Sequence, residues 1–313
     1  MNRRALARQA AGAKTPAPAV DKDASGVENV SRKLEEQLAK GDFYGALQMY
    51  KTLFMRHLKG EPGVPQQQQA IDLALEAALN LIKHDQNTAA AEMGNLLVSV
   101  YTEHHWKVDE TSKDRIRKIN AAFVTKPQFS ADLAVFLKNA VKWSSTEGSR
   151  KRGDPELQLL LARAHRQAGE LTLSAKHFLH AENPVEFADM LFEWSKQGYP
   201  SEYDLYIARV VLQLLSLENL RDANKVYDEY TAKSKQAGRN LDLPLYNFLR
   251  FLLLTLERDA LPLFQMLQER YALALNRDPA LRNYMSAIGQ KFYGLQPPRS
   301  GLSSLLEMFA GGM

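Results

Sequence analysis

The sequence predicts an all-α protein, an irregular α-solenoid built from stacked antiparallel helix pairs. Apolar residues recur at helical spacing along almost the whole chain, as in the stripe Tyr206, Ile207, Val210, Val211, Leu214 and Leu215. Strand signals are nearly absent, because no long run of alternating β-branched residues and no Asn-Gly or Asp-Gly hairpin occurs. Short polar or glycine-containing links separate the helical segments, which favours antiparallel neighbours.

Fourteen helices are predicted, and a short apolar helix is expected after them at 301–310. Several boundaries carry a capping side chain followed by a proline at the first helical position, as at 154–155, 183–184 and 278–279. The predicted helices span residues 27–40, 42–59, 66–84, 88–104, 110–123, 128–144, 154–168, 170–181, 184–197, 201–217, 219–236, 243–257, 259–275 and 278–293.

Two tight turns suggest the architecture of tetratricopeptide-like pairs. Gly41 and Gly169 each stand at the end of a predicted helix, and Ala46 and Ala175 follow in the next one. Glycine permits the turn, while a small alanine lets two helices approach closely. No strict period of about 34 residues is found. We therefore expect an irregular tetratricopeptide-like superhelix.

Four segments are expected along the chain. Residues 1–25 read as a disordered basic tail, 26–148 as N-terminal helical repeats, 149–300 as C-terminal helical repeats and 301–313 as a short apolar tail. The polar stretch 144–153 marks the middle boundary. The first twenty residues contain arginine and alanine but no acid, so an organellar transit peptide is the alternative interpretation of the tail.

Charge and composition exclude several classes of function. The formal net charge is +4, but residues 1–25 hold five bases and two acids, and the chain beyond residue 60 has one excess acid. That balance argues against a broad basic face for nucleic acid. There is no cysteine, so a disulfide scaffold, a thiol nucleophile and a thiolate metal site are excluded. The most apolar stretch, 245–256, is too short to span a membrane. We expect a cytosolic protein.

Catalytic motifs are not found. The chain lacks G-x-G-x-x-G, G-x-x-x-x-G-K-[ST], G-x-S-x-G and H-E-x-x-H, so we expect no enzyme activity and no cofactor. His177 and His180 could share a helix face, but a zinc site needs further ligands, so we interpret them as packed or solvated. The basic run at 150–152 could contact phosphate or an acidic partner, although simple solvation is the default interpretation.

The sequence contains a series of motifs in a fixed order. The first, at residues 41–56, begins with Gly-Asp-Phe-Tyr. The others lie at residues 86–90, 137–145, 177–180, 210–213, 247–254, 288–290, 292–294 and 297–298. In these motifs and in their order the chain resembles the Golgi-to-ER traffic protein four family. The resemblance covers the chain from about residue 27 to its end.

The resemblance implies a scaffold in the guided entry of tail-anchored proteins into the endoplasmic reticulum. Members hold a targeting ATPase with their N-terminal helix pairs and a ubiquitin-like adaptor with their C-terminal half. The adaptor recruits a co-chaperone that carries the tail-anchored client. By position, the ATPase-facing residues of the family correspond to Phe43, Lys59 and Glu92 here. Charged residues of this kind steer an encounter and make it sensitive to salt.

The adaptor side is expected to be hydrophobic. Leu245, Phe248, Phe251 and Leu252 recur at helical spacing, and their predicted helix is apolar nearly all round. Neighbouring helices would cover one side and a partner another, although a fully internal helix is an equally valid interpretation for each residue. The hairpin of the family is not evident at 233–243, the one polar interruption where a small hairpin or an ordered loop could lie.

Two other functions remain open on the sequence. One is an α-solenoid adaptor of a different complex, such as a proteasome-lid or vesicle-coat-like subunit. The other is an organellar helical-repeat RNA-binding protein, which would need a basic concave stripe and regularly spaced base-reading positions. The near-neutral body and the uneven helix lengths disfavour the RNA-binding interpretation.

Overall fold

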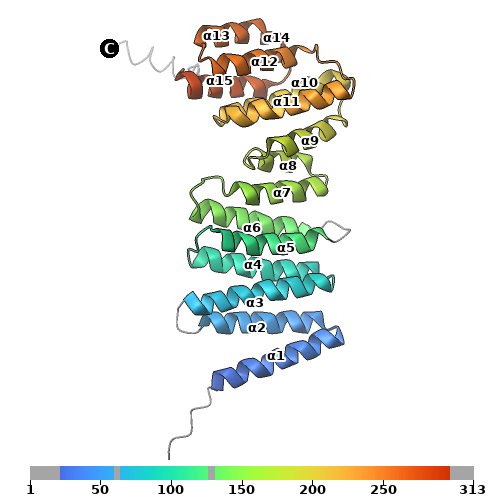
Figure 1. The fold of residues 1–313 in the computed structure, drawn as a ribbon, viewed down its shortest axis with the longest axis vertical. Helices are drawn as coiled ribbons and strands as arrows, with labels where there is room; N and C mark the ends of the chain where they lie inside the picture. Colours follow the sequence, from blue (N-terminus) through green and yellow to red (C-terminus); the bar gives the residue numbers. More distant parts are fainter. Residues whose placement is uncertain (1–21, 60–63, 126–130, 297–313) are drawn as a thin grey trace, which may run out of the picture. The chain divides into compact units, whose positions relative to one another are not determined.

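The structure is a computed structural model that describes residues 22–59, 64–125 and 131–296. Within these residues the regular structure consists of fifteen α-helices and one 3-10 helix, with no β-strand (Figure 1). The chain forms two compact units, Met1–Met93 and Gly94–Met313. No helix of the described part is long and apolar enough to cross a membrane.

The first unit is a stack of helices joined by short turns. It contains α1 (Lys22–Lys40), α2 (Phe43–Lys59), α3 (Val64–Lys83) and the start of α4 (Asn87–Glu103), since the division of the chain falls within α4. Helix α2 packs against both α1 and α3. The centre of this stack is filled by large buried side chains, among them Tyr50, Phe54, Ile71 and Leu81.

The second unit begins with helices that pack in chain order. Each helix from α5 to α9 contacts the next one (Figure 1). These helices are α5 (Glu110–Val124), α6 (Ala131–Glu147), α7 (Pro155–Gln167), α8 (Leu171–Phe178) and α9 (Pro184–Ser195). Within each unit, then, the predicted stacking of consecutive helices is confirmed.

The packing order changes in the last third of the chain, which holds η1 (Pro200–Glu202), α10 (Tyr203–Ser216), α11 (Leu220–Gln236), α12 (Pro244–Glu257), α13 (Leu261–Arg270), α14 (Ala272–Leu275) and α15 (Pro279–Tyr293). Helix α11 reaches back to α9, and α10 is packed against α11, α12 and α15. Nine of the fourteen residues of α10 are therefore buried. This arrangement makes the solenoid irregular, as predicted.

The two glycine turns have the expected conformation. Gly41 and Gly169 adopt φ values of +74° and +77°, the left-handed region that glycine enters without a steric cost. The amide that follows each glycine closes the helix end, because Asp42 N donates to Gln37 O at 3.0 Å and Glu170 N donates to His165 O at 2.9 Å. Ala46 is fully buried at the adjoining helix contact.

The capping signals at three helix starts are also confirmed. Asp154, Asn183 and Asp278 each accept a hydrogen bond from a backbone amide in the first turn of α7, α9 and α15, and a proline follows each of them. Such a cap satisfies an amide that the helix itself leaves unpaired.

Several predicted boundaries differ from the structure. The helix predicted at 259–275 is divided at Tyr271 into α13 and α14, and the one predicted at 128–144 lies at 131–147 instead. Helix α1 begins at Lys22, inside the predicted tail. The predicted helix at 301–310 lies outside the described residues. The structural units divide at residue 93, whereas the predicted division at 148 concerns partners and stays a prediction.

Candidate partner-binding surfaces

One face of α2 in the first unit is open to solvent. The α2 stripe consists of Tyr44, Gln48, Thr52, Met55 and Lys59, which are all exposed and lie within an arc of about 80° on the helix. Two of its members are large apolar side chains, with exposed fractions of 75% for Tyr44 and 48% for Met55. Exposed apolar side chains rimmed by polar residues are typical of interaction surfaces.

The three residues predicted to face the ATPase all lie in the first unit, but they are not close together. Phe43 begins α2 and Lys59 ends it, so about 24 Å of helix separates them. Lys59 is exposed, whereas Phe43 is half-buried with its ring centroid 5.0 Å from that of His84. Of the three, Lys59 alone belongs to the α2 stripe.

Glu92 on α4 is held beside the α2 stripe by an ion pair. Its carboxylate forms an ion pair with the ammonium group of Lys51, which lies on α2 about 20° from Tyr44 around the helix. Both side chains are partly open to solvent, so the pair contributes little to stability. It does fix where the Glu92 charge is presented beside the α2 stripe.

Three of the four residues predicted to bind the adaptor are in the core. Leu245, Phe248 and Leu252 have no exposed surface, because α12 is covered by α10 on one side and by α13 and α14 on others. Phe251 is the exception, with an exposed fraction of 41%. In this conformation only Phe251 is available to a partner.

Phe251 lines an apolar groove between α12 and α13. The α12–α13 groove has a volume of about 520 Å³, and its exposed apolar side chains are Phe251, Leu254, Leu263 and Met266. Arg258 and Arg270 contribute positive charge to its lining. An apolar floor with a charged rim fits a partner helix or strand that carries apolar anchors and acidic flanks.

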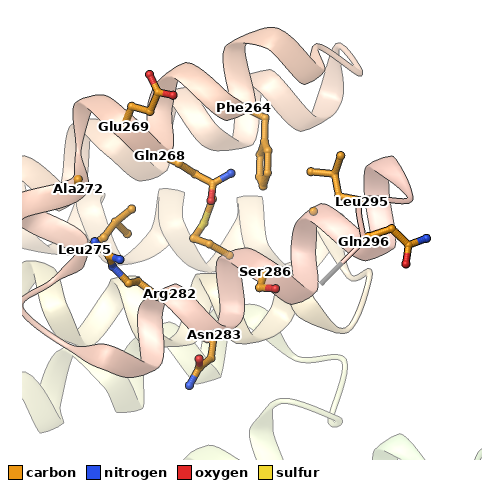
Figure 2. Close-up of a pocket in the computed structure, with 12 residues that line it drawn as sticks. Phe264, Gln268, Glu269, Ala272, Leu275, Arg282, Asn283, Ser286, Leu295 and Gln296 are labelled. Atoms are coloured by element: carbon orange, nitrogen blue, oxygen red, sulfur yellow. The ribbon is translucent and has the colours of Figure 1, made fainter. Parts of the chain in front are cut away.

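A second cavity lies farther along, between α13, α14 and α15. It has a volume of about 590 Å³, and Figure 2 shows Phe264 and Gln268 of α13 facing Ser286 of α15 across it. Leu295 closes one end, where its methyl group would come within 3.1 Å of a Cβ placed on Gly289. Its lining is more polar than that of the α12–α13 groove, with Arg282 and Asn283 at the wall.

The segment 237–243 is an ordered loop with no strand. Arg239 anchors it, because its guanidinium group lies over the rings of Tyr203 and Phe192, 3.8 and 4.2 Å from their centroids. The same side chain donates a hydrogen bond to Ser195 Oγ at 2.7 Å. Of the two interpretations of this segment, the ordered loop is the one observed.

Comparison with known proteins shows the family. A family model described as Golgi to ER traffic protein 4 matches residues 65–311. The chain belongs to the Golgi to ER traffic protein 4 family. The resemblance that the sequence motifs indicate is thereby confirmed.

Several relatives and one solved structure are similar to this chain over nearly its whole length. The Golgi to ER traffic protein 4 homologue of Oryzias latipes is 37% identical over 88% of this chain and 84% of its own. Those of Dictyostelium discoideum and Homo sapiens are each 34% identical over 91% of this chain, covering 91% and 88% of their own. The crystal structure of C. therm. Get4 is 25% identical, has a TM-score of 0.79, and covers 92% of this chain and 96% of its own.

The family model covers all of the predicted adaptor-binding residues but only one of the three predicted ATPase-binding residues. Glu92 and the four α12 residues lie within the matched range of the Golgi to ER traffic protein 4 family, whereas Phe43 and Lys59 precede it. Sequence reasoning missed Leu263 and Met266 on α13. Leu263 and Met266 are three residues apart, and each is followed directly by a buried residue, Phe264 or Leu267. This spacing indicates that α13 has an exposed apolar face beside its buried one.

No cluster of three or more histidine, aspartate or glutamate side chains that could hold a metal ion occurs in the described part of the chain. The rings of His165 and His177 instead stack with centroids 5.3 Å apart and planes inclined by 7°.

Proposed function

We propose that this protein is a non-enzymatic scaffold in the post-translational insertion of tail-anchored membrane proteins into the endoplasmic reticulum. In this role it works in the cytosol and bridges a targeting ATPase and a ubiquitin-like adaptor, and the adaptor brings the co-chaperone with its client. Membership of the Golgi to ER traffic protein 4 family is the observation that carries the proposal. Two exposed surfaces, one on each structural unit, support it.

The ATPase is assigned to the first unit. The α2 stripe offers Tyr44 and Met55 as apolar contacts, with Lys59 at its end and Glu92 at its edge. Aromatic and methionine side chains are common anchors in interfaces, and a charged rim orients the encounter. Phe43 then acts mainly through its contact with His84, which holds the start of α2.

The adaptor is assigned to the α12–α13 groove in the second unit. Leu245, Phe248 and Leu252 do not contact the adaptor in this proposal. They are buried and fix α12 in the core, while Phe251 on the same helix is exposed in the groove. The remaining contacts come from Leu254 on α12 and from Leu263 and Met266 on α13, which complete the apolar floor of the groove.

Replacing Lys59 with glutamate is expected to weaken ATPase binding about tenfold at low salt and to leave adaptor binding unchanged. Reversing a rim charge changes the interaction by about 1–2 kcal/mol in a solvated setting, and salt screens this effect. Titration of the full-length variant with each partner at two salt concentrations measures both affinities.

Lys235→Glu provides the matched control for this experiment. Lys235 is an exposed lysine in the last turn of α11, as Lys59 is in the last turn of α2, so both variants lose the same favourable interaction with a helix C-terminus. Equal weakening by both variants, or joint loss of both partners in Lys59→Glu, would contradict the assignment of the ATPase to the α2 stripe.

A further inference from the structure

A basic loop connects α6 to α7 and is held in one conformation. Ser144 Oγ on α6 accepts a hydrogen bond from Asp154 N at 2.9 Å, directly after the loop. Gly153 has a φ of +86° and lies so close to α6 that a Cβ there would come within 2.9 Å of Val141 O. The run Arg150-Lys151-Arg152 is therefore presented on a fixed backbone rather than on a free one.

A buried glutamine ties this loop to the end of α8. Gln158 is only 4% exposed, and its Nε2 donates to the carbonyl oxygen of Arg152. Because that carbonyl can only accept, the amide orientation is fixed and Oε1 faces Nδ1 of His177 at 2.7 Å. Nδ1 of His177 must then be the donor. A buried polar side chain with both ends satisfied positions the loop against the histidine.

Cations gather around this junction without acidic partners. Lys138 and Lys142 lie one turn apart on α6, Lys151 and Arg152 lie in the loop, and Lys176 lies on α8. All five side chains are exposed, and none forms an ion pair with an acid among the described residues. The other loop cation, Arg150, is paired with Glu182.

Burial lowers the pKa values of two neighbouring histidines, and the positive charge of this junction lowers them further. Burial is the main cause that lowers the pKa of His177 to about 4, and nearby positive groups lower it further. These groups are His165, His180, Lys176 and Lys138. Burial also lowers the pKa of His180, and the guanidinium group of Arg152 adds to the effect. Lysines from α6 and α8 and the loop arginine therefore act on one connected region.

Aliphatic side chains accompany the cations. Val135 lies on the same face of α6 as Lys138 and Lys142, and Leu173 precedes Lys176 by three residues on α8, with exposed fractions of 53% and 38%. Leu217, exposed by 41%, lines a groove of about 360 Å³ together with the basic loop and His180. The exposed large apolar side chains of these segments are all aliphatic. They offer no aromatic platform for stacking nucleic acid bases.

We propose that this basic–aliphatic surface, formed by Lys138, Lys142, Lys151, Arg152 and Lys176 with Val135, Leu173 and Leu217, docks an acidic polypeptide segment that carries aliphatic side chains. The charge complementarity and the groove select this occupant over nucleic acid, which would use aromatic stacking, and over a membrane, which would need a wider basic face. The proposal goes beyond the ATPase and adaptor sites and does not depend on them.

The test uses the full-length protein and a fluorescent peptide of glutamates interspersed with leucines. Fluorescence anisotropy is expected to show binding that weakens with salt and falls about tenfold or more in the variant Lys138→Glu/Lys176→Glu. Both substitutions are on exposed side chains, and circular dichroism checks that folding is retained. The control Lys225→Glu/Lys235→Glu carries the same change of net charge on α11 and is expected to bind as the unmodified protein does.

Further probes decide between occupants. A peptide with glutamine in place of each glutamate is expected not to bind, and nuclear magnetic resonance titration is expected to show the pKa of His180 rising when the acidic peptide is bound. Equal loss in the control variant, or equal binding of the glutamine peptide, would overturn the proposal. So would tighter binding of single-stranded RNA or of phosphatidylserine vesicles to the same lysines.

Discussion

The variant Leu254→Asp/Met266→Asp is expected to lose adaptor binding, with an affinity reduced by at least about a hundredfold. Each of these side chains is half open to solvent in the structure and would be covered by the partner. Covering a leucine or methionine contributes about 1.5–3 kcal/mol at full burial, and an aspartate in its place leaves a carboxylate without water in an apolar groove. Calorimetric titration with the ubiquitin-like adaptor measures the loss.

The two substitutions are expected to affect adaptor binding and not folding. Because 39% of Leu254 and 49% of Met266 is exposed, the substitutions leave the core intact and the melting temperature is expected to stay nearly unchanged. Val124→Asp is the control, since Val124 at the end of α5 is 53% exposed and lies outside the α12–α13 groove. Undiminished adaptor binding by the double variant would show that the adaptor uses another surface.

Replacing Arg277 with leucine is expected to lower the free energy of unfolding by about 3–5 kcal/mol. Asp204 on α10 has no exposed surface, and both its oxygens accept from Nη1 of Arg277, at 3.0 and 2.8 Å. Nη2 of Arg277 also donates to Ser201 O at 2.6 Å. Removing one partner of a buried ion pair leaves the other charge uncompensated. Urea denaturation of the full-length variant measures the change.

The effect is expected to extend to the helices for which adaptor binding is proposed. Asp204 also accepts from Leu245 N at 3.3 Å, so the pair holds α10, the loop before α15 and the start of α12 together. Lys196→Leu is the control, because its pair with Glu193 is more than half exposed on both sides and is worth at most about 1 kcal/mol. Similar losses in both variants would mean that Asp204 finds another partner or is hydrated.

Helix positions were predictable because their signals are local. Asp154, Asn183 and Asp278 cap their helices through backbone amides two or three residues away, and Gly41 and Gly169 set their turns through their own φ values. These effects depend on nearest neighbours in sequence. The break at Tyr271 was not predictable in this way, because residues on both sides of it continue the apolar pattern.

The buried and exposed faces of α12 were harder to separate. The helix is apolar nearly all round, so its periodicity does not distinguish Phe248, which is fully buried, from Phe251, which is 41% exposed. That distinction depends on where α10 and α13 pack, and α10 is brought there by contacts with α15, more than sixty residues later in the chain. Long-range packing of this kind leaves no local signature.

The residues predicted to face the ATPase show a related limit of sequence-based prediction. Phe43, Lys59 and Glu92 are identified by position in the family, but their geometry follows from partners that the sequence does not reveal, namely His84 for Phe43 and Lys51 for Glu92. Likewise, the basic run at 150–152 reads as a solvated loop until Gln158 and Ser144 are seen to fix it. Contacts between different structural elements decide both cases: a ring contact and an ion pair in the first, and hydrogen bonds from helix side chains to the loop in the second.

The bridging role is tested most directly by isolating the tagged full-length chain from its native source and identifying its partners by mass spectrometry. The proposal predicts that one ATPase and one ubiquitin-like protein co-purify with it, and that Lys59→Glu reduces recovery of the ATPase while Leu254→Asp/Met266→Asp removes the ubiquitin-like protein. Recovery of a different stable assembly, such as proteasome-lid or vesicle-coat subunits or an RNA, with neither of these partners present, would contradict it.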